Sequence, residues 1–170
     1  MTKRPLVAVL ALAALLVLPA ADSAAALAAA SSAMVSVSVG EAMVTANLVT
    51  KPGGESVLQV TFAPELPGFH IYSLALPTNG LDGLGVPTRV RVSGASIAVG
   101  QPAADEPTRY LQIAGLNVAL PVYPDGPVTL TVPIRLLRHG QTEVTVSYGL
   151  CSEIRCLLPV EGLKIAIGSN

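Results

Sequence analysis

The chain has 170 residues, of which 51% are hydrophobic and 12% charged, and its formal net charge at pH 7 is -1. Lysine and arginine form no basic patch, so this near-neutral balance gives no electrostatic footprint for nucleic acid. Without an N-terminal segment of about 30 residues that resembles a signal peptide, the mature chain would have about 140 residues. That is the usual size of one domain, and such a domain does not need a disulfide in order to fold.

Residues 1–33 have the order of a secretory signal peptide. Two basic residues within the first four positions precede an apolar run over 6–18, and small residues predominate over 20–33. We expect a helical signal peptide cleaved between residues 24 and 33, a mature domain at 34–170, and export to the periplasm or the medium without stable membrane insertion. An uncleaved N-terminal anchor is the competing interpretation, because the alanines could extend a run that is short for a bilayer span of about 20 residues.

Period-two alternation of apolar and polar residues recurs along the rest of the chain and predicts strands. The segments with this pattern are 35–39, 58–62, 90–92, 128–134, 144–148 and 163–167. Turn signals rich in glycine, proline and acidic or amide residues separate them. Short strands with turns at this spacing predict a single all-β sandwich domain. Pro133 lies inside its strand, which predicts an edge position or a bulge there.

Cys151 and Cys156 are the only cysteines, and four residues separate them. A disulfide between them would close a loop of about six residues and contribute roughly 2 kcal/mol in the chain-entropy model, against about 4.7 kcal/mol for a hundred-residue loop. The chain has no tryptophan, and cysteines so close in sequence cannot pin two sheets together as they do in antibody domains. A redox pair is favoured over a structural staple, although local disulfides at strand ends do occur in secreted domains.

The two cysteines lie between predicted strands, so both thiols are expected in or beside a hairpin at one end of the sandwich. A redox pair needs at least one exposed sulfur and surroundings that support a thiolate. Arg155, directly before Cys156, would favour the thiolate, whereas Glu153 would oppose it. The local charges therefore do not decide the question.

Two further segments have candidate site residues. The segment Pro67–Ser73, PGFHIYS, contains Phe69, His70 and Tyr72, and in an extended strand His70 and Tyr72 point to the same face. The alternative is a half-buried sandwich tyrosine beside a solvated edge histidine. The stretch 105–122 is long and polar before its final strand, so it predicts either a loop over a site or an ordinary surface loop.

These segments together resemble the N-terminal periplasmic domain, often called alpha, of the thiol:disulfide interchange protein DsbD family. The resemblance spans about Val35 to Ile167 and is carried by GFHIYS followed by GVPTRV, by the stretch from DE to LPV, and by VSYGLCSEIRCLLP. It implies an immunoglobulin-like β-sandwich with two cysteines in a terminal hairpin and no cofactor. It also implies a protein-disulfide reductase or interchange component that relays electrons between thioredoxin-fold periplasmic proteins.

The resemblance further implies roles for the residues around the sulfurs. Cys156 is the sulfur that faces the partner, and Cys151 is its resolving mate. His70 and Tyr72, next to Phe69, match the aromatic pair that the family places beside its cysteines.

A cap loop over the cysteines is the last implied feature. Asp105 and Glu106 match its start, Pro107 stands where the family has an aromatic residue, and Tyr110 is the residue that could substitute. The sequence shows neither the membrane domain nor the thioredoxin-like domain that accompany this fold in the family. We therefore expect a separate membrane protein to supply the electrons.

Two other classes of function remain open. One is a secreted binding or interaction module whose disulfide is purely structural. The other is a zinc or copper site built from Cys151, Cys156, His70 and His139, although no histidine spacing supports it. Hydrolase chemistry finds no support, because neither G-x-S-x-G nor H-E-x-x-H occurs.

Overall fold

The computed structural model describes residues 32–50, 55–115 and 117–169. The predicted signal peptide lies outside them except for Ser32 and Ala33, which open the first strand. Within the described residues all regular structure is β-strand, as the alternation predicted. The same residues include no helix of the length and apolarity that a membrane crossing requires.

The larger sheet has the strand order β1-β2-β3-β10-β6, and β7 also pairs with β10. Its strands are β1 (Ser32–Val39), β2 (Ala42–Thr50), β3 (Ser56–Pro64), β6 (Ser96–Ala98), β7 (Ala103–Ala104) and β10 (Val128–Leu136). All pairs are antiparallel. The apolar residues of β2, β3 and β10 alternate with polar ones and are buried on one face only.

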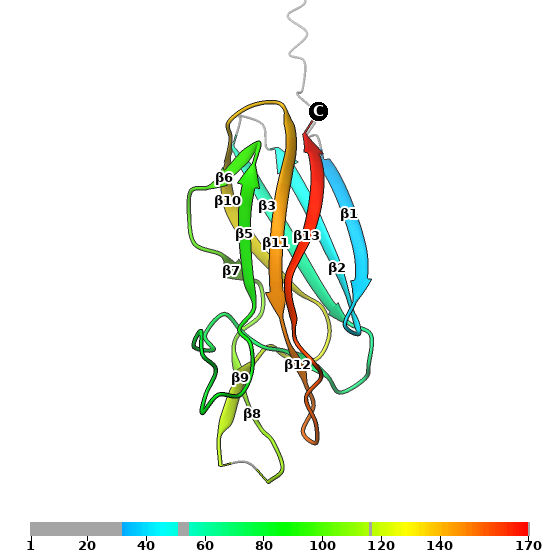
Figure 1. The fold of residues 1–170 in the computed structure, drawn as a ribbon, viewed down its shortest axis with the longest axis vertical. Coiled ribbons are helices and arrows are strands. Elements are labelled where there is room, and N and C mark those ends of the chain that lie inside the picture. Colours follow the sequence, from blue (N-terminus) through cyan, green and yellow to red (C-terminus); the bar gives the residue numbers. More distant parts are fainter. Residues whose placement is uncertain (1–31, 51–54, 116, 170) are drawn as a thin grey trace, which may run out of the picture.

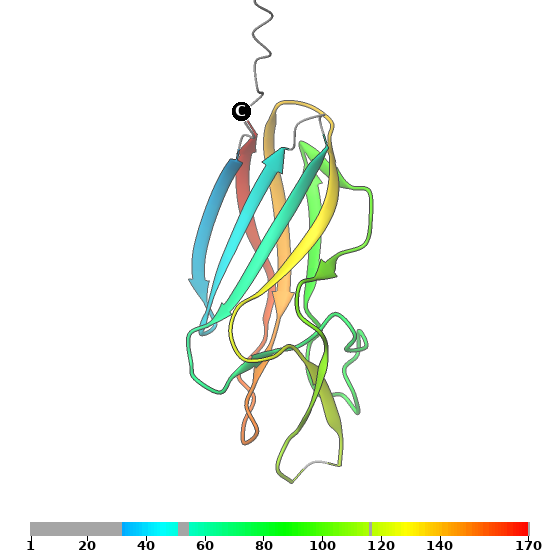
Figure 2. The ribbon, with the colours of Figure 1, turned by 180° about the vertical axis from the view of Figure 1, so that it is seen from behind.

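The smaller sheet packs on that buried face and has the order β13-β11-β5. Its strands are β5 (Arg89–Gly94), β11 (Gly140–Tyr148) and β13 (Val160–Ser169). Phe62 on β3 and Tyr148 on β11 meet edge to face between the sheets, with ring centroids 5.3 Å apart. The two inner faces form one continuous core, and the two views of the ribbon show the sheets face to face (Figures 1 and 2), so the predicted all-β sandwich is confirmed.

Pro133 does not lie on an edge strand, because β10 has β3 on one side and β6 and β7 on the other. The register with β3 runs through Pro133 without a shift, so there is no bulge. The Pro133 carbonyl accepts from the N–H of Val99, beyond the end of β6, so the proline nitrogen also faces that side. The ladder on that side is interrupted between β6 and β7, and the missing N–H therefore costs no strand bond.

Four short strands and one long loop lie beyond one end of the sandwich (Figure 1). They are β4 (His70–Ile71), β8 (Arg109–Gln112), β9 (Ala119–Val122), β12 (Leu150–Cys151) and the segment 72–88. A second apolar cluster fills this end, and it comprises Tyr72, Leu76, Ile113, Leu120, Val122 and Cys151. The pairing of β11 with β13 shifts register between Val146 and Tyr148, just before the chain enters β12. The cysteines are thus held by a packed extension of the sandwich.

Candidate functional site

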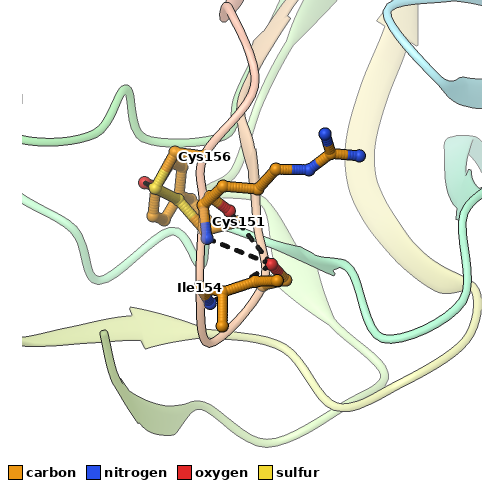
Figure 3. The surroundings of a disulfide bond; sticks show 6 residues. Cys151, Ile154 and Cys156 are labelled. Carbon is orange, nitrogen blue, oxygen red and sulfur yellow. Dashed lines mark hydrogen bonds between the residues drawn. A yellow bond between two sulfur atoms is a disulfide. The ribbon is translucent and has the colours of Figure 1, made fainter. Parts of the chain in front are cut away.

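The four residues between the cysteines form a tight turn. The N–H of Ser152 donates to the carbonyl of Arg155 at 2.8 Å, and the Ser152 Oγ accepts from the N–H groups of Ile154 and Arg155 at 3.4 and 3.2 Å. Serine is favoured at the first position of such turns because its hydroxyl makes these local bonds. Ile154 lies at the tip and is 80% exposed (Figure 3). The turn brings Cys156 back opposite Cys151.

The two cysteines face each other across this hairpin and are joined by a disulfide (Figure 3). Backbone hydrogen bonds flank them on both sides, one within the turn and one from the N–H of Leu157 to the carbonyl of Leu150 at 2.9 Å. The cysteines therefore occupy a non-hydrogen-bonded pair, where opposite residues approach most closely. Their Cα atoms are 4.0 Å apart. Strand pairing alone brings the two sulfurs within bonding distance.

The two cysteines differ in exposure. Cys151 is fully buried, at 0% exposed, and belongs to the second apolar cluster. Cys156 lies on the exposed return arm of the hairpin. An incoming thiol can therefore reach Cys156, whereas Cys151 is covered by protein.

Tyr72 is the side chain that contacts both sulfurs. Its Oη lies 3.2 Å from Cys156 Sγ and also makes a hydrogen bond with Cys151 Sγ. Burial raises the pKa of Tyr72 to about 12. The phenol therefore keeps its proton at neutral pH and remains a hydrogen-bond donor to sulfur.

Two glycines hold the Tyr72 ring in place. A Cβ at Gly149 would lie 2.8 Å from Tyr72 Cδ2, and one at Gly85 would lie 3.0 Å from Tyr72 Cζ. The Tyr72 backbone is also tied, since its N–H donates to the Gly149 carbonyl at 3.1 Å and its carbonyl accepts from Thr88 Oγ1 at 2.5 Å. The ring can pack this closely only because both neighbours lack a side chain.

His70 and Phe69 lie next to the cysteine hairpin but not on the sulfurs. The backbone of His70 pairs with Cys151, while its Nδ1 lies 3.3 Å from Asp125 Oδ1 without hydrogen-bond geometry. Phe69 is buried, and the Arg155 guanidinium lies 5.4 Å above its ring. This guanidinium is thus engaged with an aromatic ring. The two rings and Arg155 line a separate groove of about 500 Å³ that does not include either sulfur.

The residues expected to begin the cap lie elsewhere. Asp105 is tied to β10, because its Oδ1 accepts from the Thr129 N–H at 2.7 Å and its own N–H donates to the Thr129 carbonyl at 3.0 Å. Glu106 and Pro107 are exposed, and Tyr110 on β8 is 73% exposed. None of these four residues lines the groove beside Cys156.

The β8–β9 hairpin covers the site instead, through residues later in the same 105–122 segment. Ile113 and Leu120 line the groove beside Cys156, and the N–H of Ala114 donates to the carbonyl of Glu153 in the cysteine turn at 3.0 Å. The sequence offered the segment 105–122 as a polar loop over the site. In the structure its later part forms the β8–β9 hairpin, and the buried apolar residues Ile113 and Leu120 cover the site.

The loop 73–88 forms a second cover, and the sequence interpretation assigned it no role. Leu76, Leu81 and Leu84 pack into the second apolar cluster, and residues 83–86 line the groove. The loop is closed on itself by paired hydrogen bonds between Leu81 and Leu84 at 3.0 and 2.8 Å. Two signals were available, namely the recurrence of leucine within a segment otherwise rich in glycine and turn residues, and the motif GVPTRV at 85–90 that forms part of the resemblance.

The alternative metal site is not assembled. His139 lies in the turn between β10 and β11, at the end of the sandwich opposite the cysteine hairpin (Figure 1). Cys151 and Cys156 are bonded to each other, which removes both thiolates as ligands. Among the described residues no group of three or more His, Cys, Asp or Glu side chains is placed to hold a metal ion.

Comparisons with known proteins bear on the fold. No known protein-family profile matches the chain, and no curated protein matches its sequence significantly. Among solved structures, the N-terminal periplasmic domain of ScsB from Proteus mirabilis matches with a TM-score of 0.55 and 13% identity, over 78% of this chain and 49% of that one. This chain thus spans about half the length of the ScsB chain that it matches.

A second solved structure, the reduced N-terminal domain of DsbD from Neisseria meningitidis, matches with a TM-score of 0.46 and 13% identity, over 82% of this chain and 85% of that one. The match to ScsB shows that this chain has the fold of a DsbD-like N-terminal domain. The fold implied by the sequence resemblance is therefore confirmed.

Proposed function

We propose that this chain, with its DsbD-like N-terminal fold, relays electrons between thioredoxin-like partners by thiol-disulfide exchange at Cys151 and Cys156. The observation that carries the proposal is the asymmetry of the disulfide. Cys151 is fully buried against the Tyr72 hydroxyl, while Cys156 is an exposed residue that lines an apolar groove. A disulfide that only stabilised the fold would need no difference in exposure between its two cysteines. Closing a loop of about six residues would also contribute little to the free energy of unfolding.

In the oxidised protein, a partner thiolate attacks Cys156 Sγ. The bond between Cys156 and Cys151 breaks, a bond between the partner sulfur and Cys156 forms, and the electron pair passes to Cys151 as a thiolate. The partner's second thiolate then attacks the partner sulfur of the mixed disulfide and releases Cys156. The net result is transfer of two electrons, which leaves the partner oxidised and this protein as a dithiol.

The reduced protein passes the electrons on by the reverse order of bonds. The Cys156 thiolate attacks the disulfide of a downstream partner, and Cys151 then attacks Cys156 Sγ and releases the partner's thiolate. The partner leaves as a dithiol, and the Cys151–Cys156 disulfide is restored. No cofactor enters either half of the cycle.

The proposal includes a cellular setting. The signal-like order of residues 1–33 supports export, and an oxidising compartment such as the periplasm would allow the disulfide to persist. A separate membrane protein would supply the electrons, and periplasmic thioredoxin-fold proteins would receive them. The pairing of Ser32 with Val49 favours a cleavage site upstream of Ser32, because removal of Ser32 would shorten β1.

Trapping with single cysteine variants tests the proposal. Cys151→Ser is expected to accumulate a mixed disulfide through Cys156 with a thioredoxin-fold protein of the same compartment, whereas Cys156→Ser is not. Each variant is the control for the other, because both remove the same disulfide. The adducts are identified by non-reducing electrophoresis and mass spectrometry.

Failure of both variants to trap any such protein would contradict the relay. The reduction potential of the pair supplies an independent check, since structural disulfides usually have potentials below about -300 mV. A value in that range would favour the alternative of a binding module with a structural disulfide.

A further inference from the structure

The groove beside Cys156 is formed by three segments that lie far apart in sequence. The loop 83–86, the β8–β9 hairpin and the return arm of the cysteine hairpin each provide one wall. Its lining residues are Tyr72, Gly83, Leu84, Gly85, Val86, Ile113, Leu120, Cys156, Leu157 and Pro159. The reactive residue is thus itself part of the groove wall.

The size and chemistry of the groove limit what it can hold. Its volume is about 250 Å³, below the roughly 300–1,000 Å³ of most small-molecule sites. None of the described residues that line it is charged, and the Tyr72 hydroxyl and Cys156 sulfur are the only polar groups on their side chains. A charged side chain placed there would lose its hydration without gaining a partner. The groove therefore suits one or two apolar side chains.

The groove differs in this respect from the separate groove on the other side of the hairpin. That larger space is lined by four titratable side chains, those of His70, Asp125, Glu153 and Arg155. An apolar segment would have to displace water from these groups, whereas beside Cys156 it would meet side chains whose only polar groups are one hydroxyl and one sulfur. Only the uncharged groove includes the accessible sulfur.

We propose that this groove binds an apolar side chain adjacent to the partner's reactive cysteine, an inference that rests on the proposed function. A partner sulfur that bonds to Cys156 Sγ brings its neighbouring residues to the mouth of the groove, because Cys156 forms part of the wall. Burial of an apolar neighbour stabilises the mixed disulfide and the approach to it. Partners are thereby selected by the residue beside their cysteine.

Short cysteine peptides test this selection. Four peptides with a single cysteine are used. One pair has leucine or serine directly before the cysteine, and the other pair has leucine or serine directly after it. Each peptide is mixed with the oxidised, mature protein. The rate of mixed-disulfide formation is measured by acid quench and mass spectrometry. Each rate is divided by the rate of the same peptide with oxidised glutathione, which removes differences in thiol pKa and nucleophilicity. We expect a leucine peptide to react about tenfold faster than its serine partner, as partial burial of a leucine side chain predicts.

Two neighbouring residues provide a matched pair of variants. Pro159→Asp places a charge in the groove wall, whereas Leu158→Asp places the same charge one residue away, on a side chain that is 88% exposed and does not line the groove. Pro159→Asp is expected to abolish the leucine preference, and Leu158→Asp is expected to retain it. The rate of reaction with dithiothreitol and the circular dichroism spectrum check that both variants remain folded and reactive.

The outcomes separate the inference from the function on which it rests. Equal normalised rates for leucine and serine peptides would overturn the groove proposal while leaving exchange at Cys156 intact. Equal loss of preference in both variants would also overturn it, because a general charge effect would then explain the result. A disulfide that reacts with no peptide and no dithiothreitol would overturn the proposed function and the inference together.

Discussion

In the proposed exchange the leaving sulfur is that of Cys151, a residue that solvent does not reach. A thiolate formed there by attack on Cys156 would be desolvated, and burial of an unpaired charge is costly. The donor that the structure sets against this sulfur is the hydroxyl of Tyr72, whose raised pKa keeps it protonated. The phenol can thus stabilise the thiolate as the disulfide opens.

Removal of that hydroxyl is expected to slow exchange more than it destabilises the fold. A hydrogen bond to a charged group contributes about 1.5–3 kcal/mol, so Tyr72→Phe should reduce the rate of reduction by dithiothreitol by roughly tenfold or more. Tyr123→Phe is the matched control, because Tyr123 is equally buried and its hydroxyl accepts from the N–H of Leu74 at 3.1 Å, away from the sulfurs. Stopped-flow measurement of both variants decides the point. A similar rate for both would contradict the role given to Tyr72.

The loop 73–88 is held to the smaller sheet by one side chain. Arg89, at the start of β5, donates from Nη1 to the carbonyls of Leu74 at 3.3 Å and Thr88 at 2.9 Å, and from Nη2 to the carbonyl of Leu76 at 3.2 Å. A guanidinium can satisfy several carbonyls at once because its donors form a planar fork. Arg89 thus ties both ends of the loop to the sandwich, and residues 83–86 between those ends line the groove.

Replacement of Arg89 by methionine is expected to loosen this loop selectively. The variant keeps an unbranched apolar stem but leaves the carbonyls without their donors, at a cost of about 1–3 kcal/mol in the free energy of unfolding. Amide hydrogen exchange over 73–88 should rise, while exchange in β11 stays slow. Arg91→Met, two residues later on an exposed position of the same strand, is the control. Equal exchange in the two variants would show that Arg89 does not anchor the loop.

The strands were predictable from sequence, whereas the walls around the sulfurs were not. In β10 every second residue from Val128 to Ile134 is apolar and buried, so period-two alternation located the strand directly. Tyr72 was singled out as a site residue for its place in the motif, and the structure sets it on both sulfurs. The groove walls at 83–86 and Ile113 have no periodic signal, because their burial depends on segments distant in sequence that pack together only in the folded chain. Tyr110 was named as the residue that could substitute for the aromatic residue of the cap, yet it faces solvent.

Across the whole molecule, buried tyrosines connect the fold to pH. Burial raises the pKa of Tyr123, and the shift is larger at two others. Tyr148 lies in the main core between the sheets and donates its hydroxyl to the Val39 carbonyl, while Tyr72 lies in the second cluster at the cysteine end. Burial raises the pKa of each to about 12, and the nearby Glu65 adds to the effect at Tyr148. Both apolar clusters therefore favour the neutral phenol.

This arrangement predicts that alkaline conditions destabilise the protein. An unfolded tyrosine has a pKa of 10.0, so between pH 10.0 and about 12 the folded state binds more protons than the unfolded state. The stabilisation is complete below pH 10.0 and is lost as pH rises through the folded pKa of about 12. Urea unfolding at a series of pH values should show the free energy of unfolding falling over this interval. Tyr148→Phe should make that fall shallower, because one of the linked protons is removed. An unchanged slope in Tyr148→Phe would mean that Tyr148 ionises in the folded protein as easily as in the unfolded chain.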